Sequence, residues 1–504
     1  MNEAKPLKPA RRKPLLSRIP AGFVQAVLKG HSGLGLAFAA AIYIVCLSGT
    51  LLVFYDEFIW WEAAGSPEIE EVSNAAIQTA LAGAVERSGP EIGHVYATLP
   101  ADDNPLLRIY VYAQEQSAWL ADEAGRIVGP METPWSAFLS ELHIFLHLPY
   151  TWGGFVVGMT GVALLSSLIS GILAHPRIFR DAFHLRLGGS PRLQEADLHN
   201  RIGVWGLPFH FIVSLSGAFL GLLTIVVGVL GMAMFNGDAG KIYELFLPPE
   251  PADNPAAAPM IDILPMLESQ PTESRLERIE LIHPTEQGGG AVLSYRDDSV
   301  LAGSKEYGFE RNGGQYYAKS LPAATTGERI QGSLGPLHFG WFGGAIIKVV
   351  YFILGLGMTY LAVGGVNIWL ARRRDKGRPA PVWERIWAAT VWSQPVTFGM
   401  VAVVALLRPS ASSELMVGIW LGGTALCLAL CAIMTPRLLA QSGKLATATL
   451  LVAIAIGHSI FLAGASGSVT IWAINAALLA GGLLLLAAWK FTGGSPATQI
   501  PEPA

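Results

Sequence analysis

The stretch WGGFVVGMTGVALLSSLISGILA, residues 152–174, carries no charged side chain and is long enough to cross a membrane as one helix. Hydrophobic residues make up 52% of the 504-residue chain and charged residues only 14%, against about 25% charged in soluble domains. Seven further segments are comparably long and apolar: 33–58, 203–234, 340–371, 386–407, 414–434, 446–464 and 469–489. The sequence therefore predicts a mainly α-helical, polytopic membrane protein with about eight transmembrane helices.

Basic residues indicate which loops face the cytoplasm. They cluster before the first span, between the second and third, and after the fourth, where Arg372, Arg373 and Arg374 stand together. By the positive-inside rule, the N-terminus 1–32 and the loops 175–202 and 372–385 are cytoplasmic. No cleavable leader is recognisable, so the first span is expected to remain as an anchor. We expect a multi-pass protein of a bacterial inner membrane with both termini in the cytoplasm.

Two long loops, 59–151 and 235–339, carry patterns typical of folded structure and would be periplasmic. The first has an amphipathic helix near 74–88, followed by alternating strands and a hairpin over 118–128. The second repeats this plan after a Pro/Ala-rich linker, with a helix near 260–269 and three strands. We expect two small α+β modules, inserted between helices 1 and 2 and between helices 3 and 4. Residues 386–504 would form an added C-terminal bundle of four helices, with a separate role that the sequence does not reveal.

Five histidines stand where apolar segments begin: His31, His143, His147, His199 and His338. Neutral imidazole is a common metal ligand, and haem irons near both faces of a bilayer would let electrons cross it. His143 and His147 are four residues apart and would share one helix face. A continuous helix from His147 to His175 would be about 42 Å long, against a hydrocarbon core of ~30 Å, so His143 and His147 belong at the outer surface.

The same length argument places His338 at the outer surface and Arg372 inside. His31, His175 and His199 are the ligand candidates on the cytoplasmic side, and Arg177, Arg180 and Arg201 could bind haem propionates through their guanidinium groups. His210 lies eleven residues after His199, about 16 Å along a helix, and would point into the bundle near mid-depth.

The alternative for each lone histidine is an ordinary wet, amphipathic residue. It stays open for His210 and is favoured for His175, His184 and His458, and for His94 and His283 in the modules. The three cysteines lie inside spans, and no Cys-x-x-Cys-His haem attachment is present. Neither a dinucleotide fingerprint nor a phosphate-binding Walker loop occurs, so electrons would have to come from another molecule. No nucleic-acid partner is expected.

Four segments together resemble the PepSY-associated transmembrane family over roughly residues 25–375. They are the run from Gly154 through His175–Pro176–Arg177 to Asp181, the segment from Asp197 through His199 to Trp205, and the segments Leu337–Gly340 and Gly364–Leu370. This family includes iron-regulated inner-membrane proteins of the PiuB type and ferric-siderophore reductases of the FoxB type.

The resemblance implies an oxidoreductase that passes electrons outward to ferric iron held by a siderophore and releases it as Fe(II). Siderophores hold Fe(III) through hard oxygen donors, so one added electron weakens their grip. His31 and His199 match the family's inner histidines, and His143 (or His147) and His338 its outer ones. The implied cofactor is haem b, two groups held non-covalently by histidine pairs. The electron donor would be a quinol or a cytoplasmic reductase.

Two other functions fit the same sequence. One is a permease for a siderophore or iron chelate, although the spans hold few charges to mark a polar path. The other makes the outer modules binding or inhibitory domains and the spans an anchor, which needs far fewer helices than eight.

Overall fold

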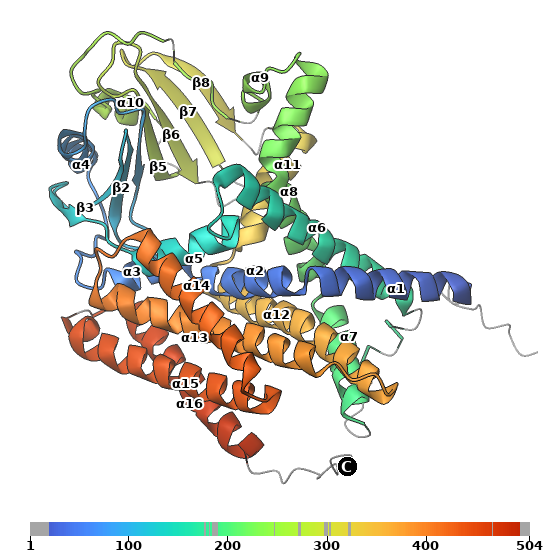
Figure 1. Cartoon of the computed structure of the whole chain (residues 1–504). Helices are drawn as coiled ribbons and strands as arrows, with labels where there is room; N and C mark the ends of the chain where they lie inside the picture. Colours follow the sequence, from blue (N-terminus) through green and yellow to red (C-terminus); the bar gives the residue numbers. More distant parts are fainter. Residues whose placement is uncertain are drawn as a thin grey trace, which may run out of the picture.

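The computed structural model describes residues 20–175, 178–180, 182–183, 190–245, 247–251, 253–270, 274–296, 301, 304–320, 324–465 and 467–493. Long helices pack side by side, and one β-sheet lies at one end of them (Figure 1). We call the end of the helices that lies next to the sheet the sheet end, and the opposite end the far end. Seven helices in the described residues are long and apolar enough to span a membrane: α6 (Tyr150–Ala174), α8 (Leu207–Met234), α12 (Gly344–Asp375), α13 (Pro381–Leu407), α14 (Ser413–Ala429), α15 (Pro436–Phe461) and α16 (Val469–Gly493).

The first predicted span is a broken helix. Helix α1 (Ala21–Ala37) meets α2 (Ala39–Leu52) at an angle of 67°, and a short helix α3 (Tyr55–Glu62) follows. Glycines at positions 33 and 35 precede the break and lower the cost of leaving the helical conformation. If the bent pair counts as one span, the described part of the chain holds up to eight, which confirms the predicted multi-pass helical architecture.

The two long loops form one sheet instead of two separate modules. Its eight antiparallel strands follow the order β4-β3-β2-β1-β5-β6-β7-β8. Their bounds are β1 (His94–Thr98), β2 (Leu107–Tyr112), β3 (Gln116–Ala121), β4 (Ile127–Pro130), β5 (Arg275–Ile282), β6 (Gly290–Arg296), β7 (Ser304–Glu310) and β8 (Gln315–Ser320). Strand β1 pairs with β5, from His94 opposite Ile282 to Thr98 opposite Arg278. Each would otherwise be the edge of a four-stranded sheet with unpaired backbone groups, which this pairing satisfies.

The sheet has one apolar face and one polar face. Side chains such as Val95, Ile109 and Leu281 are buried against α4 (Asn74–Arg87) and α10 (Leu264–Glu268). The opposite face carries alternate residues of the same strands, among them His94 and Tyr96, as the period of two along a strand requires.

Two helices lead from the sheet to the spans. Helix α5 (Pro134–Phe145) follows β4, and α11 (Thr326–Phe339) follows β8. Both end at a left-handed residue: Leu146 has φ 52° and Gly340 has φ 77°. At the far end, α7 (Pro191–Trp205) leads into α8 through Gly206, so the described end of the predicted loop 175–202 is helical. The remaining short elements are α9 (Gly240–Tyr243) and the 3₁₀ turns η3 (Leu430–Ala432) and η4 (Ala463–Ala465).

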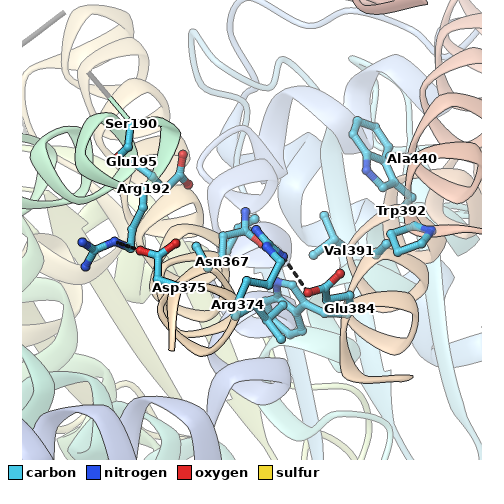
Figure 2. A pocket seen from close by; sticks show the side chains of 16 residues that line it. Ser190, Arg192, Glu195, Asn367, Arg374, Asp375, Glu384, Val391, Trp392 and Ala440 are labelled. Carbon is cyan, nitrogen blue, oxygen red and sulfur yellow. Dashed lines mark hydrogen bonds and ion pairs between the residues drawn. The ribbon is translucent and has the colours of Figure 1, made fainter. Parts of the chain in front are cut away.

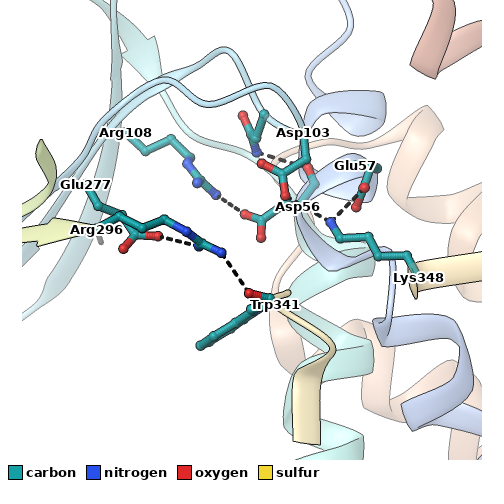
Figure 3. A network of polar contacts seen from close by, with 9 residues as sticks. Asp56, Glu57, Asp103, Arg108, Glu277, Arg296, Trp341 and Lys348 are labelled. Atoms are coloured by element: carbon teal, nitrogen blue, oxygen red, sulfur yellow. Dashed lines mark hydrogen bonds and ion pairs between the residues drawn. The ribbon is translucent and has the colours of Figure 1, made fainter. Parts of the chain in front are cut away.

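A network of charged residues joins the sheet to the helices (Figure 3). Lys348 of α12 is 5% exposed, and its Nζ lies 2.7 Å from Glu57 and 2.9 Å from Asp103. Arg108 of β2 pairs with Asp56 at 2.9 Å. Because these pairs connect α3, α12 and the sheet, the sheet is fixed to the ends of two spans.

The four C-terminal helices share a core with the rest of the chain. Phe398 of α13, Trp420 of α14 and Ile471 of α16 share one apolar cluster with Trp61 of α3 and Phe138 of α5. The C-terminal bundle, α13–α16, therefore packs directly on the helices that follow α2 and β4.

Candidate functional site

Two histidines from separate helices meet at the sheet end. His143 lies in the last turn of α5 and His338 in the last turn of α11, and their ring centroids are 6.2 Å apart with the planes inclined by 31°. Nδ1 of His143 lies 2.9 Å from the carbonyl oxygen of Val45, and Nδ1 of His338 lies 3.0 Å from Oγ of Ser216. When Nδ1–H donates in this way, the lone pair on Nε2 is left to bind a metal.

Glycines on the two facing spans make room for these rings. A Cβ added at Gly49 of α2 would lie 2.5 Å from Cε1 of His143. One added at Gly217 of α8 would lie 2.8 Å from Cε1 of His338. Since real Cβ contacts are longer than this, any side chain at either position would displace a ring. The sequence contains these glycines among 56 others, and no pattern in it distinguishes them.

The spacing of this pair fits one metal between two imidazoles. Metal–imidazole bonds are about 2.0 Å long and each ring centre lies about 1 Å behind its nitrogen, so rings on opposite sides of one metal have centroids about 6 Å apart. His143 and His338 match that separation. Among the described residues, no group of three or more His, Cys, Asp or Glu side chains is arranged to hold a metal ion. Two protein ligands suit a haem iron, whose other bonds go to the porphyrin.

A second group of histidines gathers at the far end. Nδ1 of His31 on α1 lies 3.0 Å from the carbonyl oxygen of Ser167 on α6. His175 ends α6, and His199 of α7 lies against Gly364 and Gly365 of α12. His199 interacts electrostatically with both His31 and His175. The structure therefore brings together the three histidines that the sequence assigns to the cytoplasmic side.

Buried polar atoms without partners lie in this second group. Nδ1 of His199 has no hydrogen-bond partner among the described residues, and neither do Nε and Nη1 of Arg201. Arg201 is 4% exposed, and Asp197, the acid of its ion pair, is 4.0 Å away. A buried guanidinium with unused donors is costly unless a ligand supplies an acceptor, and a carboxylate fits it best. Arg180 is exposed, and Arg177 lies outside the described residues.

His147 and His210 do not join either group. His147 has φ 53°, stacks on Phe138 with centroids 4.8 Å apart, and faces Trp420 of the C-terminal bundle. His210 is fully buried on α8, where its Nε2 lies 3.4 Å from the carbonyl oxygen of Leu354. Because α7 and α8 are separate helices, the predicted common face of His199 and His210 along one straight helix is absent.

Three further histidines contact their neighbours in other ways. His458 is 1% exposed and stacks on Trp61. Nδ1 of His94 lies 2.9 Å from Glu280, and that of His283 3.3 Å from Glu286. His94 and His283 are partly exposed, as an ordinary surface role requires, whereas the buried His458 is not the wet interfacial residue favoured from the sequence. His184 lies outside the described residues.

Comparison with known proteins covers the part of the chain that holds both histidine groups. The profile of the PepSY-associated TM region matches residues 28–372, which includes α2 and α12 but none of the C-terminal bundle. An uncharacterized protein of Pseudomonas aeruginosa is 29% identical over 308 residues, which cover 56% of this chain and 75% of that protein.

Proposed function

We propose, since this chain belongs to the PepSY-associated transmembrane family, that it is a haem-containing ferric-siderophore reductase of a bacterial inner membrane. In this proposal electrons cross the membrane and reduce siderophore-bound iron to Fe(II) on the periplasmic side. The observation that carries the proposal is the 6.2 Å separation of His143 and His338, with both Nδ1 atoms bound to neighbouring helices.

The histidine groups assign residues to two haem b sites. His143 and His338 would hold the outer haem, and His31 and His199 the inner one, with Arg201 placed for a propionate. Each haem would supply a site that accepts and gives single electrons. The carbonyl of Val45 and the hydroxyl of Ser216 orient the outer rings, while Gly49 and Gly217 let those rings approach the spans.

The orientation follows from the distribution of basic residues. Arg372, Arg373 and Arg374 end α12 at the far end, which supports placing that end and both termini in the cytoplasm. The sheet would then be periplasmic. Its polar face offers a ferric siderophore a cavity of about 530 Å³ lined by residues that include Tyr96, Tyr110 and Arg278.

Spectroscopy of the protein purified from haem-replete cells tests the proposal. We expect a Soret band, two haems per chain, and loss of about half of the haem in His143→Ala and in His338→Ala. His147→Ala is the matched control, because His147 lies on the same segment but faces the C-terminal bundle. A wild-type protein without a Soret band, or outer variants with full haem, would contradict the assignment.

An assay in proteoliposomes separates reduction from transport. With a reductant inside and a ferric siderophore outside, we expect external Fe(II), which a ferrous chelator reports. Accumulation of the intact chelate in the lumen without any reductant would instead indicate a permease.

A further inference from the structure

A cavity of about 540 Å³ lies at the far end, between α7 and α12 on one side and α13 and α15 on the other (Figure 2). This volume falls in the range of small-molecule sites, about 300–1,000 Å³. One wall belongs to the region that the family profile matches, and the other wall belongs to the C-terminal bundle. The cavity therefore exists only because the bundle is present.

The charges at this cavity are largely paired with one another. Arg192 lies 2.5 Å from Asp375, and Arg374 lies 2.6 Å from Glu384 (Figure 2). Both arginines of the lining are thus held by carboxylates, and an anionic ligand such as a phosphate would meet acids as well as bases. The cavity favours a neutral ligand.

The rest of the lining is apolar and aromatic, with a few hydrogen-bonding groups. Val363, Val391 and Trp392 form apolar wall, and Asn367 adds a side-chain amide. Trp387 also lines the cavity; it is 8% exposed, and its Nε1 has no hydrogen-bond partner among the described residues. A ligand with a flat ring and carbonyl or hydroxyl oxygens would satisfy these groups.

The cavity adjoins the inner histidine group through Glu195. A Cβ added at Gly364 would lie 3.3 Å from Oε1 of Glu195 and 3.5 Å from Nδ1 of His199. Glu195 lines the cavity, and its carboxylate and the His199 ring both lie against Gly364 of α12. A ligand whose hydroxyl donates a hydrogen bond to Glu195 would be held next to His199.

We propose that this cavity binds the ring of a membrane quinol, with Glu195 accepting from a hydroxyl and Asn367 and Trp387 donating to the opposite oxygen. This inference rests on the proposed function and names its electron donor. In the overall reaction one quinol loses two electrons and two protons to become a quinone, and two siderophore-bound Fe(III) ions each gain one electron to become Fe(II). The two protons are released to water at the charged rim of the cavity.

Direct binding of decylubiquinol to the purified full-length protein, kept under argon and reduced beforehand with dithionite, tests this site without turnover when it is measured by isothermal titration calorimetry. We expect saturable binding to the wild type and at least tenfold weaker binding to Trp387→Phe, which removes only the N–H donor, and to Asn367→Leu. Trp383→Phe is the matched control, because Trp383 lies one turn earlier on α13, is 60% exposed and does not line the cavity. Absence of saturable binding to the wild type, or equal affinity in all three variants, would overturn the inference.

A second variant separates this inference from the proposed function. His338→Ala should stop ferric reduction and leave decylubiquinol affinity unchanged, because His338 lies at the sheet end. If dithionite drives Fe(II) release but decylubiquinol does not bind, the quinol site is wrong and the reductase stands. If decylubiquinol binds with the expected variant pattern but no donor yields Fe(II), the site stands and the reductase is wrong.

Discussion

Trp61 and His458 stack with ring centroids 4.2 Å apart and planes inclined by 15°, although 397 positions separate them in the chain. Nε2 of His458 also lies 2.8 Å from the carbonyl oxygen of Trp61. Asn475 completes the contact: its Oδ1 accepts from Nε1 of Trp61 at 2.8 Å, and its Nδ2 lies 3.1 Å from Nδ1 of His458. This buried group holds the C-terminal bundle against α3.

Asn475→Leu should therefore destabilise the protein. It leaves buried polar atoms of Trp61 and His458 without a partner, each costing about 1–3 kcal/mol. Thermal unfolding in detergent should show a lower midpoint. The double variant Trp61→Phe/Asn475→Leu should lose less stability than the two single variants lose together, because both substitutions remove the same hydrogen bond. Full additivity would contradict the contact.

Gly217→Ala should remove the outer haem while leaving the inner one in place. The new methyl carbon would lie 2.8 Å from Cε1 of His338, so the ring must leave its present position opposite His143. The haem-to-protein ratio of the purified protein should fall by about half. Gly228→Ala on the same helix is the control, since a Cβ there meets nothing within 4 Å, and it should keep the full ratio.

Lys348→Met should cost about 3–5 kcal/mol of stability, because it leaves the buried Glu57 carboxylate without its cation. Adding Glu57→Gln removes that charge and should recover much of the loss. Chemical denaturation of the single and double variants measures both steps. A single variant as stable as the wild type would show that the pair carries no net interaction.

The contribution of His94 to the stability of the folded protein should depend on pH. The hydrogen bond to Glu280 raises the pKa of His94, against the lowering effect of burial. Burial raises the pKa of Glu280, but the hydrogen bonds from His94 and Tyr96 outweigh it and lower that pKa. The stabilisation that comes from the raised pKa of His94 is complete below about pH 6.5, which is the pKa of histidine in the unfolded chain. It is lost as the pH rises through the pKa of His94 in the folded protein. The lowered glutamate pKa gives stability that is full above about pH 4.3 and is lost as pH falls through its folded value.

His94→Gln should thus lower the unfolding midpoint most between about pH 4.5 and 6.5, and the difference from wild type should shrink towards pH 9. Because the His94 side chain is 34% exposed, the effect should stay below about 1 kcal/mol. Unfolding midpoints at pH 5.5, 7 and 9 test the trend, and a difference that is as large at pH 9 as at pH 5.5 would rule it out.

The spans and most strands could be predicted because each has a local signature of length, apolar content or alternation. The pairing of β1 with β5 could not, since an edge strand and a central strand of this kind have the same pattern. Strand β8 was missed for a different reason: its residues Gln315–Ser320 are only partly buried and show little alternation.

The sequence predicts which histidines of the candidate site lie at the same end of the spans. The choice between His143 and His147 was not. Helical spacing places them on one face, but the chain leaves the helix at Leu146, so His147 faces the C-terminal bundle and only His143 meets His338. Likewise, only the fold shows that Phe398 and Trp420 pack on α5.

The joined sheet sets an order of assembly for the chain. Strand β1 exposes an open edge until β5 has been synthesised, and in between the ribosome must deliver two further spans, α6 and α8. At about 5–20 residues per second, that edge waits on the order of ten seconds or longer. During this interval the unpaired backbone groups of the nascent half-sheet are open to pairing with other chains.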